Sequence, residues 1–285
     1  MSGQSVPPPL SGSRPGTQPA LSSRPWWARL AAAFALACGI WLLVNLLAFS
    51  IFGEDYSLSS HTFRAITTCF LVLIALPLLL RWEHTRPADY GVGMNAGIVR
   101  GVTVGALSYL VPCLAAAAIV LILGLSHVEV TGNALVVAGE GITILALVIL
   151  YEAIPEELIF RGYLFRVLSE RLPGWATIFA QALLFCAFGA AIGAAANIDR
   201  LLLFFFFALS LGYLRQVTGT VFATIGFHAI FQTFAQWMLG EQWPALSLTD
   251  PHEWFALIAL GLAPFLLAPV VSAIIVRFVR ADRSR

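Results

Sequence analysis

Long apolar runs separated by short polar segments dominate this chain. Windows of high apolarity lie near residues 27–52, 62–80, 98–124, 138–160, 175–195, 201–217, 219–239 and 254–278. A helix that crosses the hydrocarbon core of a bilayer needs about 20 predominantly apolar residues, with a range of roughly 17–25. The pattern therefore predicts an all-α, polytopic membrane protein with about eight transmembrane helices.

The composition agrees with this prediction and limits the kinds of molecule that we expect the protein to contact. The chain is 59% hydrophobic and 11% charged, whereas about 25% of the residues of a soluble domain are charged. The lipid bilayer is the expected partner, and no nucleic-acid-binding motif is present. All four cysteines fall inside predicted spans without a CxxC spacing, so neither disulfide nor redox chemistry is expected.

The arginines give the expected orientation. All sixteen basic residues are arginine, and with the N-terminus in the cytoplasm fourteen of them lie on the inner side and only Arg64 and Arg200 on the outer side. Cytoplasmic loops of membrane proteins carry such an excess of positive charge. We expect a multi-pass protein of the cell (inner or plasma) membrane with both termini in the cytoplasm.

The chain divides into a short tail and one membrane domain. Residues 1–25 contain six Pro, six Ser and three Gly, a composition that cannot bury enough apolar surface to fold. We interpret residues 1–25 as a disordered cytoplasmic tail and residues 26–280 as the transmembrane helical domain.

Two adjacent carboxylates lie in the fourth apolar run, followed by an arginine. Glu157 and Arg161 are four residues apart and should face each other as an ion pair on a helix. Glu156 is turned by about 100° from Glu157, and Pro155 should kink or restart the helix. Two interpretations remain open: Glu156 is free to act as a general base on a water, or the charges mark the cytoplasmic end of the span.

A second polar group lies in the seventh run. His228 and Gln232 are four residues apart and project from one helix face, which Thr224 shares. A histidine inside a membrane span can also be a polar contact between helices. By the topology above, His228 and Glu156 both lie in the cytoplasmic half, so they can meet.

The segment Glu156-Glu157-Leu158-Ile159-Phe160-Arg161-Gly162 resembles the EExxxR signature of the CAAX-protease and bacteriocin-processing (CPBP, or Abi) family of intramembrane glutamic proteases. Residues 207–219 followed by His228 resemble its later helices and their His-x-x-x-Asn motif, and the likeness covers about residues 138–240. It implies a CAAX-protease-like bundle with a peptidase site open to the cytoplasm. Glu156 would be the general base, Glu157 and Arg161 an orienting pair, and His228 a group that stabilises the oxyanion.

The chain departs from the family pattern twice. Gly189 stands where the Phe-x-x-x-His motif, which begins here at Phe185, has its histidine, and Gln232 replaces the asparagine. Gly189 and Gly193 also form a GxxxG pattern, which predicts close helix packing. Losing one acid–base group can lower the rate about 10²–10⁴-fold. The replacement of the motif histidine by Gly189 therefore bears directly on activity.

Three functions follow. The first is an intramembrane endopeptidase that hydrolyses membrane-associated or prenylated-type peptides with a Glu-activated water. The second is a catalytically impaired relative that acts as an immunity or scaffold protein, and the third is a small transporter or channel. No cofactor is expected, and one histidine with two glutamates falls short of the usual ligand set of a catalytic zinc, so no metal is expected either.

Overall fold

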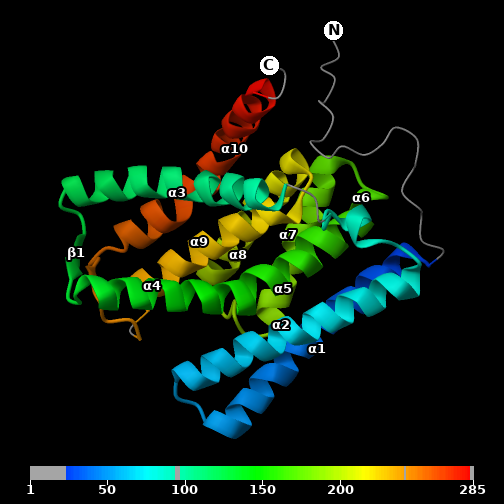
Figure 1. The fold of residues 1–285 in the computed structure, drawn as a ribbon, viewed down its shortest axis with the longest axis horizontal. Helices are drawn as coiled ribbons and strands as arrows, with labels where there is room; N and C mark the ends of the chain where they lie inside the picture. The colour runs from blue at the N-terminus through cyan, green and yellow to red at the C-terminus, as the bar shows by residue number, and fades with distance from the viewer. Residues whose placement is uncertain (1–23, 94–96, 241, 283–285) are drawn as a thin grey trace.

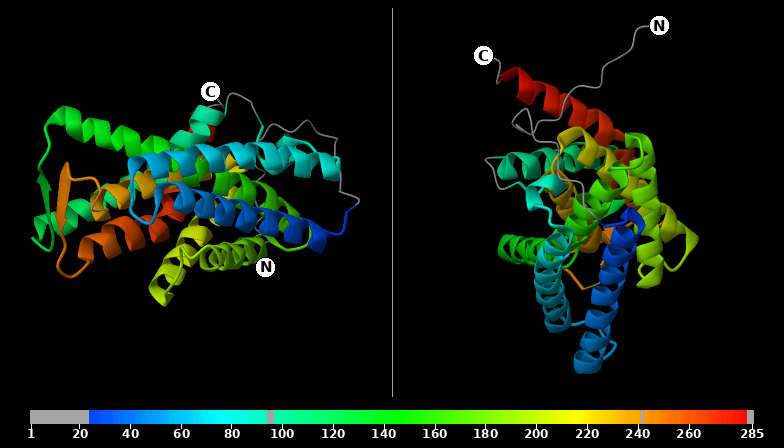
Figure 2. Two further views of the ribbon diagram at one scale, coloured as in Figure 1. Left: turned by 90° about the horizontal axis from the view of Figure 1, so that it is seen from below. Right: turned by 90° about the vertical axis from the view of Figure 1, so that its right-hand side faces the viewer.

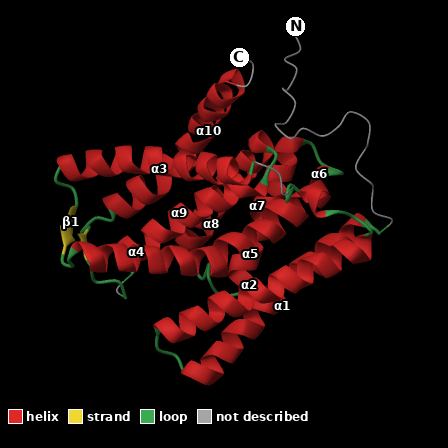
Figure 3. Ribbon diagram, in the orientation of Figure 1, coloured by secondary structure: helices red, strands yellow, loops and turns green. Residues whose placement is uncertain are grey.

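The computed structural model describes residues 24–93, 97–240 and 242–282. The predicted tail, residues 1–25, therefore lies almost entirely outside the described residues. Helices make up nearly all of the described chain, and two short strands pair at one end (Figure 3). The predicted all-α membrane fold is confirmed, and a single helical bundle holds the polar side chains of the candidate site.

The first two helices form a hairpin at one side of the bundle. Helix α1 (Trp26–Phe52) turns back at Gly53, whose φ is +83°, into α2 (Leu58–Glu83). The Ser57 side chain caps α2 by accepting a hydrogen bond from the Ser60 amide, which satisfies one of the unpaired donors of a helix start. The right-hand view of Figure 2 shows this hairpin extending away from the other helices.

The end of the hairpin that carries Arg29 and Glu83 is tied by buried charges. Arg29 Nε donates to Glu83 Oε2 at 2.8 Å, and its Nη1 donates to Glu170 Oε2 at 2.6 Å. Tyr90, at the end of the short helix η1 (Pro87–Tyr90), donates its hydroxyl to Glu83 at 2.9 Å. Burial, the largest influence, raises the pKa of Tyr90 to about 12. These contacts fix α1 and α2 against the helix that carries the glutamates.

Helices α3 (Ile98–Ile122) and α9 (Val221–Leu239) pack closely along each other. A Cβ atom at Gly105 would collide with the Ala223 carbonyl, and one at Gly226 would collide with the Val102 carbonyl. These glycines therefore set the separation of the two helices. Because Gly226 lies two residues before His228, this packing also fixes the depth of the histidine.

The fourth helical stretch is continuous over Ala134–Ser169. It comprises α4 (Ala134–Val148), the π-helical η2 (Ile149–Ala153), α5 (Ile154–Glu157), the π-helical η3 (Leu158–Leu164) and α6 (Phe165–Ser169). Pro155 lies in the first turn of α5, and the wider turn before it closes with a bond from Ile154 N to Ile149 O. The helix is thus not broken at Pro155. Wider π turns flank the two glutamates instead, as is frequent at functional sites.

The remaining elements complete the bundle. They are α7 (Gly174–Ala191), α8 (Ile198–Thr218), η4 (Phe255–Leu262) and α10 (Ala263–Asp282), with the antiparallel strands β1 (His127–Val130) and β2 (Leu246–Thr249). Strand β1 lies in the connection between α3 and α4, and β2 lies in the connection between α9 and η4. The two strands pair at the left of Figure 1. Asp250 follows β2 and accepts from Ser126 Oγ at 2.6 Å and from Ala256 N at 3.0 Å. Although burial acts in the opposite direction, these hydrogen bonds hold the pKa of Asp250 below its usual range.

Seven helices of the described chain are long and apolar enough to cross a membrane, against the eight spans predicted. The exception is α9, which is a helix of 19 residues at the predicted place. Its sequence includes His228, Gln232 and Gln236, and most of its residues are buried or half-buried among the other helices. Its polar side chains therefore contact protein groups, and its low hydropathy follows from carrying part of the candidate site.

Candidate active site

Glu157 and Arg161 form the ion pair that their spacing predicts. Arg161 Nη1 lies 2.9 Å from Glu157 Oε1, and both side chains are 0% exposed. The pair therefore lies inside the bundle and not on its surface. Such a pair is stable only when the two charges compensate each other.

His228 joins the pair from the neighbouring helix α9. Its Nδ1 lies 2.8 Å from Glu157 Oε1, and its Nε2 lies 4.0 Å from Glu156 Oε2. Because Glu157 Oε1 also accepts from Arg161, we assign a proton to Nδ1, which then donates to this oxygen. Nε2 is then the nitrogen that faces Glu156, and the two residues meet as the sequence predicts.

The gap between Glu156 and His228 is suited to a water molecule. A separation of 4.0 Å is too long for a direct hydrogen bond, but one water placed about 2.8 Å from each atom can bond to both. Glu156 has 8% exposure, and His228 has 1%. A nucleophilic water would therefore be largely shielded from bulk solvent.

Aromatic rings surround the charged groups. The Arg161 guanidinium lies over the Phe185 ring at 4.4 Å, and Phe207 packs edge-on against His228 with ring centroids 4.8 Å apart. Arg215 Nε donates to the Arg161 carbonyl at 2.9 Å. The sequence analysis included Phe207 and Arg215 only within the segment 207–219 that resembles the family. Their contacts with His228 and Arg161 are seen only in the structure.

The middle family motif, Phe-x-x-x-His, differs most from the pattern. A Cβ atom at Gly189 would lie 2.5 Å from Phe204 Cε1 on α8, and only 3.2 Å from the Ala195 Cβ. Gly189 therefore lies in close helix contact, as predicted. Gly193 does not take part in this contact: it follows the end of α7 with a φ of +79° and has open space beside it. The GxxxG interpretation is wrong for Gly193, which terminates the helix and starts the turn.

Gln232 lies on the same face of α9 as His228 but serves a different carboxylate. Its side chain interacts with Glu152, which also accepts a hydrogen bond from Gln236 Nε2 at 2.8 Å. Gln236 and Glu152 were not among the predicted site residues. The signal was available, because Gln236 is four residues after Gln232 and Glu152 is four residues before Glu156.

Comparison with known families adds the decisive observation. Residues 138–234 match the family described as "Type II CAAX prenyl endopeptidase Rce1-like". This part of the chain resembles an Rce1-like domain. The resemblance seen in the sequence is confirmed, and the matched residues include both glutamates, Arg161 and His228. A comparison with curated proteins finds no match.

The Rce1-like domain places a chemically useful set of charges together. With Glu156 and Glu157 ionised, Arg161 balances only one of the two negative charges. Buried charges inside a membrane protein need compensation. The site, which consists of the two glutamates, Arg161 and His228, is neutral only when either Glu156 or His228 holds one additional proton. Such a shared proton is what a general acid–base pair uses.

The described residues do not suggest a metal centre in the Rce1-like domain. No group of three or more His, Cys, Asp or Glu side chains in the described ranges has an arrangement that could hold a metal ion. Of the candidate donor atoms, Glu157 Oε1 is already committed to both Arg161 and His228. The arrangement is best described as a carboxylate and an imidazole facing each other across the space of a water.

Proposed function

We propose that this multi-pass membrane protein is an intramembrane endopeptidase in which Glu156 activates a water to hydrolyse membrane-associated or prenylated-type peptides. The observation that carries the proposal is the position of His228, with Nδ1 at 2.8 Å from Glu157 and Nε2 at 4.0 Å from Glu156. A structural polar contact between helices would not require the second nitrogen to face a second glutamate.

The proposed reaction begins with the water between Glu156 and His228. Glu156 removes one proton as the water oxygen attacks the peptide carbonyl carbon, which produces a tetrahedral intermediate with a negatively charged oxygen. The imidazolium form of His228, held by Glu157, donates a hydrogen bond from Nε2 to that oxygen. When the carbon–nitrogen bond breaks, Glu156 returns its proton to the departing amine.

Glu157 and Arg161 act in this scheme as positioning residues. Glu157 fixes the ring of His228 and stabilises its protonated form, as a carboxylate behind a histidine does in hydrolases. Arg161 neutralises Glu157, and its fit between Phe185 and the carboxylate fixes the direction of the pair. We also propose that the site faces the cytoplasm, because the arginine distribution places both chain termini there.

A second function has an observation in its favour. Since the Phe204 ring and Ala195 occupy the space beside Gly189, the chain has no side chain there to polarise a substrate or water. That feature favours a catalytically impaired relative, which would bind peptides as an immunity or scaffold protein without cutting them.

One experiment separates the two functions. The purified protein in detergent micelles is incubated with a prenylated, fluorescence-quenched peptide, and the Glu156→Gln variant is compared with Glu54→Gln, which changes an exposed glutamate. The proposal predicts cleavage by the wild type and by Glu54→Gln, and at least a hundredfold loss in Glu156→Gln. If the wild type does not cleave, and a cellular phenotype survives Glu156→Gln, the impaired-relative function replaces it.

A further inference from the structure

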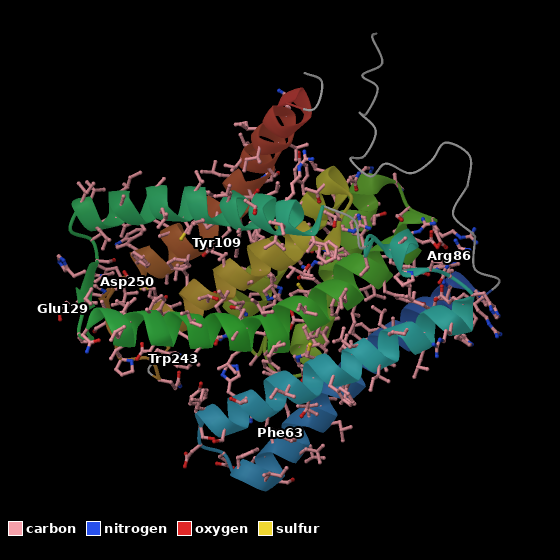
Figure 4. All side chains as sticks on the ribbon, in the orientation of Figure 1. Phe63, Arg86, Tyr109, Glu129, Trp243 and Asp250 are labelled. Carbon is pink, nitrogen blue, oxygen red and sulfur yellow. The ribbon has the colours of Figure 1, made fainter. Side chains whose placement is uncertain are left out.

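A polar cavity lies beside α2 and α9, separate from the water site between Glu156 and His228. Its volume is about 240 Å³, and its walls include Arg64, His61, Glu152, Gln236 and Trp243. At about 30 Å³ per molecule of liquid water, this volume corresponds to roughly eight waters. Figure 4 labels Trp243 below α4, facing the α2 helix that carries Phe63 and Arg64. Glu152 lies one turn before Glu156, about 6 Å along the helix axis.

Two charged groups in this cavity are only partly satisfied. No hydrogen bond or ion pair joins the Arg64 guanidinium to another residue of the described chain, and its Nε atom is buried without a partner. Glu152 Oε1 accepts from Gln236 at 2.8 Å and Gln232 also interacts with this side chain, but Glu152 Oε2 is buried without a hydrogen bond of its own in the described chain. Both residues are half-buried, and a buried polar atom without a partner is costly, so Arg64 and Glu152 each offer a position for a ligand.

Aromatic side chains that contact one another line another part of the cavity. The His61 and Tyr151 rings meet edge to face with centroids 5.9 Å apart. Tyr56 OH lies 3.1 Å from His61 Nδ1, and Tyr151 OH donates to Asn45 at 3.2 Å. Binding sites for small molecules combine such aromatic walls with a few placed polar groups.

The charges indicate the chemical class of the ligand. A guanidinium binds a carboxylate through two parallel hydrogen bonds, whereas a carboxylate with a free oxygen accepts from an ammonium group. A purely anionic ligand would leave Glu152 unpaired, and a purely cationic one would leave Arg64 unpaired. We propose that the cavity binds a small zwitterion that carries a free ammonium and a free carboxylate, as an amino acid or a dipeptide does.

In this site Arg64 holds the carboxylate of the ligand and Glu152 holds its ammonium group. Gln236 keeps the Glu152 side chain in place, and the rings of Tyr151 and Trp243 cover the apolar part of the ligand. The site does not depend on peptide hydrolysis at Glu156. Failure of one proposal therefore leaves the other unaffected.

The test measures binding of glycyl-phenylalanine to the purified full chain in a neutral detergent by isothermal titration calorimetry. The wild type should bind the dipeptide, and N-acetylation or C-terminal amidation of the dipeptide should each weaken binding at least tenfold. Arg64→Gln and Glu152→Gln should also weaken it at least tenfold. Arg81→Gln, at the other end of α2, and Glu129→Gln, on β1, change exposed residues and should bind as the wild type does.

Three results with the dipeptide would overturn the proposal. They are absence of dipeptide binding at millimolar concentration, equal binding of the blocked and free dipeptides, and wild-type binding by both Arg64→Gln and Glu152→Gln. Tighter binding of phosphoethanolamine than of the dipeptide would also reject it, because the site would then recognise a lipid headgroup. The blocked dipeptides are tested on the wild-type protein, so the result stands even if a variant fails to fold.

Discussion

The buried pair of Glu157 and Arg161 gives the sharpest test of the structure around the candidate site. Replacing Arg161 by Met keeps a long apolar side chain but removes the charge, so Glu157 loses the partner that lies 2.9 Å away. Replacing Glu157 by Gln keeps an acceptor for His228 but leaves the guanidinium unpaired. Both side chains are 0% exposed, so water cannot compensate the remaining charge.

The expected magnitudes follow from this burial. Removing one partner of a buried pair costs about 3–5 kcal/mol, so each single variant should lower the free energy of unfolding by about 4 kcal/mol. The double variant leaves no uncompensated charge, and we expect it to cost about 5 kcal/mol in total. The resulting coupling energy of about 3 kcal/mol is at the upper end for residues in direct contact.

The assay is unfolding in mixed micelles by increasing SDS, followed by far-UV circular dichroism. A matched control is Arg166→Met, since Arg166 also lies four residues from a glutamate on the same helical stretch. Its distance to Glu170 is 3.9 Å and its side chain is 18% exposed, so its loss should cost less than about 1 kcal/mol. Additive single costs, or a cost for Arg161→Met no larger than that for Arg166→Met, would refute the buried pair.

Three further predictions concern other parts of the molecule. Gly189→His alone should destabilise the protein, because a Cβ atom there would lie 2.5 Å from the Phe204 ring. Adding Phe204→Ala should relieve this contact and raise peptidase activity. An unchanged rate in a folded double variant would show that the missing histidine does not limit activity. Glu83→Gln should lower the free energy of unfolding by about 2–3 kcal/mol, because Arg29 and the Tyr90 hydroxyl lose a charged acceptor, and an SDS titration that matches the wild type would contradict this. The folded-state pKa of Asp250 is below its usual range, so Asp250 stabilises the fold above about pH 3.9, and this stabilisation is lost as the pH falls further. Thermal unfolding of Asp250→Asn should lack this pH dependence. A pH dependence identical to that of the wild type would exclude Asp250 as its source.

Local sequence spacing predicted the parts of the site that lie on one helix. The separation of four residues between Glu157 and Arg161 was enough to predict their ion pair. The face of α9 that carries His228 and Gln232 also followed from periodicity. These predictions succeed because helix geometry fixes the relation between neighbours in the chain.

Contacts between distant segments were not predictable from the sequence. Arg29 pairs with Glu83 and with Glu170, which are 54 and 141 residues away, and no local pattern indicates either partner. The helix face of Gln232 was predicted, but its contact with Glu152 was not. That contact depends on the register of α9 against the fourth helical stretch. Gly193 was misinterpreted because a spacing of four residues says nothing about where a helix ends.

One predicted span, residues 219–239, forms helix α9, but its hydropathy is lower than that of the seven other spans. A sequence window treats polar residues as unsuited to a membrane, yet in α9 they lie against Glu152 and Glu157. The cavity beside Arg64 was missed for a related reason. Its walls come from α2, the fourth helical stretch and the segment after α9, which meet only in the folded protein.

The central claim, that Glu156 activates a water for direct attack on a peptide bond, is tested by a single turnover in ¹⁸O-labelled water. A prenylated peptide is mixed with excess wild-type protein or with Glu156→Gln, and the new carboxylate is analysed by mass spectrometry. The account predicts one ¹⁸O atom in the wild-type product and at least a hundredfold slower cleavage in the variant. An unlabelled first-turnover product, or an unchanged rate in Glu156→Gln, would contradict it.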